Sequence, residues 1–250
     1  MRQQQIINNY LNKVDKGDAV YIDIGASTVS NLSDRIVKQS KKTVFIEPLE
    51  HRASHWERFN SDNFVIINDF AKPQNIVSLL DEHIQDNDIT YLDIDIDGYD
   101  YFVLEALLKY KKPYMIIAEV NEKIPAPIKF CVNYDDDYDW GGSHFYGMSI
   151  CKAYELLEKY NYDLVEFSIN NSTRDPNVIF IRKDKNTTNL SLNPEQEWEE
   201  RYKNPRLKGN MKSFHYNNNV DHFLTLSESE AITAINSFYS DRQGKYEIYV

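Results

Sequence analysis

Three aspartates alternate with isoleucines in one short stretch of the sequence, as Asp93, Asp95 and Asp97. On a strand, residues two apart share a face, so these carboxylates would follow one another at steps of about 6–7 Å. Carboxylates crowded in a buried sheet must be protonated, paired or bound to a cation, and no basic residue stands nearby in the sequence. We therefore predict a site for Mg²⁺ or Mn²⁺, with a solvated acidic rim as the alternative. Its ligands would be some of Asp95, Asp97, Glu119 and Asn121.

A histidine in a glycine-rich segment is the best candidate for a general base. His144 lies within Gly141–Gly147, which closes a long acidic loop, and the pKa of a histidine can lie near the working pH. A structural histidine in a turn is the alternative, and Asp95 is the second candidate catalytic residue. The loop itself, around 135–139, superficially resembles a calcium-binding loop, but Trp140 stands where an EF-hand needs glycine. We therefore expect acceptor contacts or solvated charge there.

A single glycine follows the first apolar run, in the order Asp23-Ile24-Gly25-Ala26-Ser27. A dinucleotide fingerprint needs further glycines that let the backbone approach a pyrophosphate, and here Ser27, Val29 and Ser30 stand in their places. Pyrophosphate binding is disfavoured, whereas a purine-ribose cofactor without a diphosphate, such as S-adenosylmethionine, fits. An ordinary turn between a strand and a helix is the alternative.

Acidic residues also end the next two apolar runs. Glu47 follows the second run at the spacing at which a carboxylate accepts hydrogen bonds from ribose hydroxyls. Asp69 and Phe70 follow the third, where a carboxylate could receive an adenine amino group and a ring could stack on the base. The alternatives are a carboxylate at a helix N-terminus and a surface turn. The predicted cofactor-binding residues are Asp23, Gly25, Ala26, Ser27, Glu47, Asp69, Phe70 and Asp93.

Short apolar runs alternate with amphipathic segments through the first half of the chain, which indicates parallel βαβ units in a doubly wound α/β sheet. Ligands of such a sheet bind beyond the carboxyl ends of its strands. The expected strands are 19–24, 43–46, 64–67, 89–96 and 114–119. The expected helices are the opening residues to about Val14, then 30–39, 52–59, 75–83 and 101–110.

The second half of the chain is organised differently. An irregular stretch from Val120 to about Gly147 precedes a helix at 149–160, a strand at 163–168, a polar turn at 170–175 and a strand at 177–182. This order predicts an antiparallel hairpin at one edge of the sheet. We expect one domain over residues 1–183. Residues 184–250 would then be an extension, with one helix near 228–240, that forms a lid, an accessory layer or a subunit contact.

Composition narrows the classes of partner. The sequence has 28 Lys and Arg against 39 Asp and Glu, a formal charge of −11, so nucleic acid is a poor partner. No apolar run reaches the ~20 residues of a membrane span, and the polar start of the chain has no signal-peptide core. Cys131 and Cys151 form no disulfide framework or metal motif. We expect a cytoplasmic protein and leave open whether it forms a homo-oligomer.

Together these motifs resemble the FkbM-type branch of the class I S-adenosylmethionine-dependent methyltransferases. The resemblance runs from about Val20 to Lys183. It is carried by Asp23-Ile24-Gly25-Ala26, Glu47-Pro48, Asp95-Ile96-Asp97-Gly98-Tyr99-Asp100-Tyr101, Glu119-Val120-Asn121 and Tyr146-Gly147-Met148-Ser149. It implies a Rossmann-like sheet of seven strands with an edge hairpin, S-adenosylmethionine as methyl donor, and a hydroxyl acceptor on a sugar, a glycan precursor or a similar small polar molecule. Metal use would be similar to that of the macrocin-type sugar O-methyltransferases.

Two departures from the FkbM pattern bear on the expected chemistry. Val29 stands where the turn of that branch usually has a second glycine, which affects the cofactor pose. Asp93 stands where a lysine is common, which makes the site more acidic. Two rival functions stay open at this point: an NAD-dependent oxidoreductase acting on sugars, and a non-catalytic binding protein on a methyltransferase scaffold.

Overall fold

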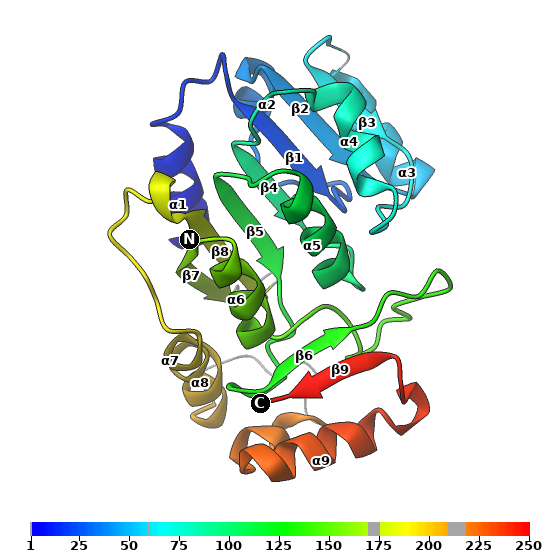
Figure 1. Cartoon of the computed structure of the whole chain (residues 1–250), viewed down its shortest axis with the longest axis vertical. Helices are drawn as coiled ribbons and strands as arrows, with labels where there is room; N and C mark the ends of the chain where they lie inside the picture. Colours follow the sequence, from blue (N-terminus) through cyan, green and yellow to red (C-terminus); the bar gives the residue numbers. More distant parts are fainter. Residues whose placement is uncertain (1, 60, 170–175, 210–218) are drawn as a thin grey trace. The chain divides into compact units, whose positions relative to one another are not determined.

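Seven strands form one mixed sheet in the order β3-β2-β1-β4-β5-β8-β7 (Figure 1). The computed structural model describes residues 2–59, 61–169, 176–209 and 219–250. The strands are β1 (Val20–Ile24), β2 (Lys42–Ile46), β3 (Phe64–Ile67), β4 (Tyr91–Ile94), β5 (Met115–Glu119), β7 (Tyr162–Ile169) and β8 (Pro176–Arg182). The order reverses between β1 and β4, which is the arrangement of a doubly wound sheet. The predicted fold class is confirmed.

The hairpin at the sheet edge is confirmed as well. β7 and β8 pair antiparallel, from Tyr162 opposite Arg182 to Ile169 opposite Pro176, and β8 lies next to β5 in the strand order. The sheet therefore has an antiparallel edge that a plain dinucleotide-binding sheet lacks. The polar turn predicted at 170–175 lies outside the described residues.

The chain divides into two compact units. The first comprises Met1–Ile96 with Phe102–Ala118, and the second comprises Asp97–Tyr101 with Glu119–Val250. Residues of the predicted extension therefore pack in the same unit as the residues that follow β5. The roles predicted for residues 1–183 and 184–250 stay predictions.

The first unit is built from near-continuous apolar strands. β1 and β4 are buried along their whole length, and β2 is buried from Thr43 onward, because helices can cover both faces of a parallel sheet. α4 and α5 cover the face of the sheet turned toward the viewer in Figure 1. The helices are α1 (Arg2–Leu11), α2 (Asp34–Gln39), α3 (Glu50–Ala53), η1 (Ser54–Phe59), α4 (Ile76–Ile84) and α5 (Asp100–Tyr110).

Two of the boundaries that differ from the sequence prediction in the first unit bear on the candidate site. The fourth strand was expected to reach Ile96, but β4 ends at Ile94, and Asp97 has a left-handed backbone with φ +54°. The three alternating aspartates therefore do not share one strand face. The second helix was expected from Ser30 but begins at Asp34, with the preceding residue in an extended conformation as its N-cap.

The second unit contains a small ladder that the sequence prediction missed. β6 (Lys129–Val132) lies inside the stretch expected to be irregular, and it pairs antiparallel with β9 (Tyr246–Tyr249). α9 (Glu228–Phe238), close to the predicted 228–240, packs on this ladder (Figure 1). The shared apolar core includes Phe130, Phe145, Phe223, Ile235 and Tyr239.

Apart from α6, the remaining described helices of the second unit are short. α6 (Ile150–Lys159) begins after Ser149, whose side chain caps it by accepting from the Lys152 amide. The others are η2 (Lys183–Lys185), α7 (Pro194–Trp198), η3 (Glu199–Lys203), α8 (Asn204–Leu207), η4 (Asp221–Thr225) and η5 (Ser240–Arg242). Over the described part of the chain, every helix is too short or too polar to cross a bilayer.

Candidate functional site

The turn after β1 is built around Gly25. Its backbone has φ +87°, and a Cβ added there would lie 1.7 Å from the Asp95 carbonyl oxygen. Gly25 is therefore required by the close approach of the chain that follows β4. The predicted reason, room for a ligand, is not needed to explain it. The backbone amides of Gly25 and Ala26 donate to the Ile46 carbonyl, at 2.9 and 3.2 Å, and these bonds join the turn to the end of β2.

The carboxylate of Glu47 is fixed beside this turn. One oxygen accepts from the Ser27 amide at 2.8 Å and the other from the Leu49 amide at 2.9 Å. The side chain is buried, with 2% exposed. Each carboxylate oxygen can accept two hydrogen bonds, so each retains one acceptor direction for a ligand hydroxyl. The role of Glu47 as a ribose contact stays a prediction.

Ser27 also has a left-handed backbone, with φ +42°. Its carbonyl accepts from the Trp56 indole nitrogen at 2.7 Å. This contact ties η1 to the glycine turn. Trp56 was not predicted as a site residue, because nothing in its sequence neighbourhood links it to a turn 29 residues earlier.

Exposed apolar side chains follow the first three strands of the first unit. Val29 follows β1 with 80% of its side chain exposed, Leu49 follows β2 with 39%, and Phe70 follows β3 with 54%. Apolar residues that are exposed singly are common on protein surfaces, so the cofactor contact predicted for Phe70 stays a prediction. Asp69, next to the exposed ring, is exposed and accepts from the Phe70 amide at 2.7 Å.

Two of the predicted cofactor residues form a buried acid pair. Asp23 and Asp93 are register neighbours on β1 and β4, with 5% and 6% exposed. Burial and then the charge of Asp93 raise the pKa of Asp23 well above its usual value. Burial also raises the pKa of Asp93. Two adjacent carboxyls in low dielectric cannot both ionise readily, so the pair retains a proton more strongly than exposed aspartates do.

Hydrogen-bond donors surround this acid pair. Asp23 accepts from the Ser30 hydroxyl at 2.5 Å, and Asp93 accepts from the Tyr91 hydroxyl at 2.7 Å and the Asn31 amide at 2.8 Å. These donors lower the pKa that burial raises. Asp93 is thus engaged on β4, and the structure gives it a setting different from that of Asp95 and Asp97.

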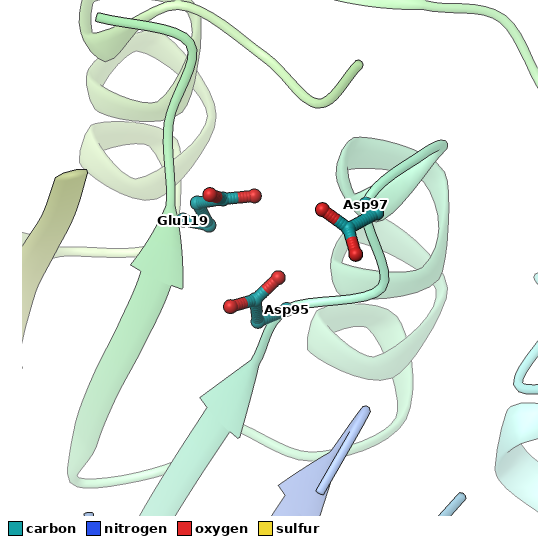
Figure 2. A group of neighbouring side chains, drawn as sticks. All are labelled: Asp95, Asp97 and Glu119. Atoms are coloured by element: carbon teal, nitrogen blue, oxygen red, sulfur yellow. The ribbon is translucent and has the colours of Figure 1, made fainter. Parts of the chain in front are cut away.

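Three of the four predicted metal ligands meet in one group. Each of Asp95, Asp97 and Glu119 offers a carboxylate oxygen within 4.8 Å of the others. Figure 2 shows the three side chains pointing toward one another, from the ends of β4 and β5 and from the turn before α5. The register explains the meeting, because Ile94 and Ala118, the residues before Asp95 and Glu119, are paired. We call these three residues the carboxylate cluster.

The fourth predicted ligand, Asn121, is fully buried. Its side-chain amide donates to the His144 and Tyr146 carbonyls at 2.8 and 3.2 Å. These bonds fix the amide orientation, since the reverse would face oxygen with oxygen. None of the described residues donates a hydrogen bond to its Oδ1. A buried acceptor without a partner is costly, so a bound cation or hydrogen-bond donor would stabilise this oxygen.

Asn121 follows the end of β5 by two residues. The backbone amides of Val120 and Asn121 donate to the carbonyls of Pro176 and Met148. Glu119 is also near enough to Tyr146 to contribute, after burial and Glu122, to the raised pKa of its phenol. The all-oxygen set is of the kind that hard divalent cations take.

His144 is buried, with 9% exposed. Its Nε2 lies 3.1 Å from Asn219 Oδ1, and its ring centroid lies 6.0 Å from that of Phe238. Its carbonyl accepts from the Tyr239 hydroxyl at 2.7 Å and from Asn121. The residue therefore links the loop to α9, and its role as a general base stays a prediction.

The sequence matches no family model and no curated protein. Many solved structures are similar to this chain, and three of them show the low level of identity. A hemolysin candidate from Streptococcus thermophilus is 14% identical over 84% of this chain and 76% of its own, with a TM-score of 0.48. Magnesium protoporphyrin IX methyltransferase from Synechocystis, with bound SAM, is 7% identical over 72% and 78%, with a TM-score of 0.45. An S-adenosylmethionine-dependent methyltransferase from Clostridium acetobutylicum is 12% identical over 71% and 88%, with a TM-score of 0.41.

Similarity at this level concerns the fold alone. The fold assignment rests on the strand order and the antiparallel edge described above. The FkbM-type subgroup, the acceptor and the metal stay predictions.

Proposed function

We propose that this chain is an S-adenosylmethionine-dependent methyltransferase. The observation that carries the proposal is the Glu47 carboxylate, held beside the glycine turn by two backbone amides and left with spare acceptor directions. A ribose bound there would present its hydroxyls to Glu47. The exposed Phe70 and Leu49 side chains would cover an adenine ring. A turn with Ser27 in place of a glycine favours a cofactor without a diphosphate.

The proposed acceptor is a hydroxyl of a sugar, a glycan precursor or a similar small polar molecule. The resemblance to the FkbM-type branch supports this class, and the acidic, oxygen-rich carboxylate cluster is suited to a divalent cation that polarises a hydroxyl. Asp95, Asp97, Glu119 and Asn121 would hold Mg²⁺ or Mn²⁺, which would lower the pKa of the acceptor hydroxyl.

In the proposed reaction the acceptor oxygen attacks the sulfonium methyl carbon. The carbon–sulfur bond breaks with its electron pair on sulfur, so S-adenosylhomocysteine leaves uncharged. The hydroxyl proton passes to His144 or to Asp95, the two predicted bases. Positioning of the two substrates provides most of the acceleration, because a sulfonium methyl is already a reactive electrophile.

Calorimetric titration tests the cofactor directly. We expect S-adenosylhomocysteine to bind and NAD not to bind. Glu47→Gln should weaken S-adenosylhomocysteine binding about tenfold or more, since each charge-assisted hydrogen bond contributes about 1.5–3 kcal/mol. The matched control is Glu105→Gln, which removes a carboxylate paired with Lys109 on the surface of α5. Equal affinity of the Glu47 and Glu105 variants would contradict the ribose contact.

A labelled-methyl transfer screen against sugars and sugar nucleotides tests the acceptor class. Each positive reaction is repeated with excess EDTA and then with added Mg²⁺ or Mn²⁺. Loss of turnover that the metal restores supports the cation, whereas full activity in EDTA rejects the cation and leaves the methyltransferase proposal intact. Retention of NAD in place of S-adenosylhomocysteine would favour the oxidoreductase.

A further inference from the structure

Asp97 owes its position in the carboxylate cluster to an unusual backbone conformation. With φ +54° it lies in the left-handed region, which residues with a side chain seldom occupy and which aspartate tolerates better than most. β4 has already ended at Ile94. The direction of the Asp97 carboxylate therefore depends on whatever holds this turn.

The turn is held by the loop that ends at Gly147. The Tyr138 hydroxyl lies 2.9 Å from the Asp97 carbonyl oxygen and 2.6 Å from that of Phe145, so its proton is shared between the turn and its own loop. The Gly147 amide donates to the next carbonyl of the turn, that of Gly98, at 2.7 Å. The loop thus donates hydrogen bonds to the backbone carbonyls of both Asp97 and Gly98.

Packing reinforces these hydrogen bonds. A Cβ added at Gly98 would lie 2.7 Å from Cε1 of the Tyr138 ring, so the ring lies directly on the turn. The Tyr99 ring meets Tyr134 and Tyr138 edge-on, at centroid distances of 4.9 and 6.0 Å. Tyr138 also packs against the apolar core that contains Phe145. It therefore joins the turn to the core of the second unit.

We propose that Tyr138 is a positioning residue for the cation site, and that its hydroxyl holds the Asp97 carboxylate toward Asp95 and Glu119. The inference rests on the cation binding proposed above, which the unpartnered, buried Asn121 oxygen supports independently of the carboxylates. Tyr138 itself touches neither the cation nor the substrates in this account. It acts through the backbone of Asp97, as groups behind metal ligands commonly do.

The test measures Mn²⁺ binding by electron paramagnetic resonance of the free ion, together with S-adenosylhomocysteine binding and thermal melting. Tyr138→Phe keeps the ring and removes the hydroxyl. We expect its dissociation constant for Mn²⁺ to rise about tenfold or more, as for other groups behind metal ligands, while that for S-adenosylhomocysteine changes less than about twofold. The matched control is Tyr134→Phe. It also loses a hydroxyl from the same loop, one that donates to Asp136, and it should bind both ligands like the wild type.

A double-variant cycle separates positioning from general loosening. Asp97→Asn should weaken Mn²⁺ binding strongly, and adding Tyr138→Phe to it should cost little more, because both changes act through one carboxylate. Wild-type Mn²⁺ affinity of the Tyr138→Phe variant would overturn the role of Tyr138 but not the proposed cation site. Additive effects of the two substitutions on Mn²⁺ affinity would have the same consequence. A wild-type protein that binds S-adenosylhomocysteine but no Mn²⁺ would overturn both the inference and the proposed cation. Failure to bind S-adenosylhomocysteine would overturn the proposed cofactor, and the Mn²⁺ results would still decide the role of Tyr138.

Discussion

Replacing Gly25 by alanine is expected to destabilise the chain by two separable effects. The position has φ +87°, and a left-handed backbone costs a residue with a Cβ about 1–2 kcal/mol. The new Cβ would also lie 1.7 Å from the Asp95 carbonyl oxygen, far inside contact distance. Relief of such an overlap by backbone movement costs about 1–3 kcal/mol more. We expect Gly25→Ala to lower the free energy of unfolding by about 2–5 kcal/mol.

Gly142→Ala is the matched control for this prediction. Gly142 also has a left-handed backbone, with φ +69°, but a Cβ there meets nothing within 4 Å. Gly142→Ala should therefore lower the free energy of unfolding only by the cost of the left-handed backbone, about 1–2 kcal/mol. Both changes reduce the freedom of the unfolded chain equally, so their difference isolates the contact with Asp95. Urea unfolding measures this difference in the free energy of unfolding, provided that the dependence on urea concentration is the same for both variants. Equal losses for the two variants would refute the close approach as the reason for this glycine.

Three further changes test other parts of the structure. The pKa of Asp23 is raised by burial and by Asp93, so this pair stabilises the fold at low pH, and that contribution is lost as the pH rises from about 4 through the raised pKa. In urea unfolding, Asp23→Asn should make the free energy of unfolding fall less steeply over this pH range. The exposed-site variant Asp69→Asn should leave the slope unchanged. Ser149→Ala removes a helix cap and two other buried hydrogen bonds and should cost about 2–3 kcal/mol, against which an unchanged melting curve would argue. Arg206, buried and bound to Asp221 through two nitrogens at 2.9 Å, should not be replaceable by lysine without a drop in melting temperature, because an ammonium cannot make the paired contact.

The parallel half of the sheet could be predicted from sequence because its strands are local, nearly continuous apolar runs separated by amphipathic segments. β6 and β9 could not. Each is four residues long, and β6 lies within a polar, tyrosine-rich stretch whose partner is more than a hundred residues away. Single-strand patterns carry no information about such a distant partner.

The sequence indicated which residues of the carboxylate cluster lie together better than it indicated how the backbone places them. The proximity of Asp95, Asp97 and Glu119 could be predicted, because the ends of parallel strands converge, whereas the binding of a cation there stays a prediction. Strand alternation was the wrong reason for Asp97, since β4 stops early. The Asp97-Gly98 pair, a common turn signal, could have indicated this. Nothing local marked Tyr138 as its support, 41 residues further on.

The pairing of β6 with β9 affects the order in which parts of the chain fold. Lys129 aligns with Tyr249, and Lys152 is bound to Glu247 at 2.7 Å, so these contacts close loops of about a hundred residues. Such closures are slow compared with local βαβ assembly. On a ribosome adding about 5–20 residues per second, β6 would wait several seconds for its partner to be synthesised. During that interval β6 would lack its partner strand, so the backbone hydrogen bonds of this ladder could not yet protect the second unit from proteases.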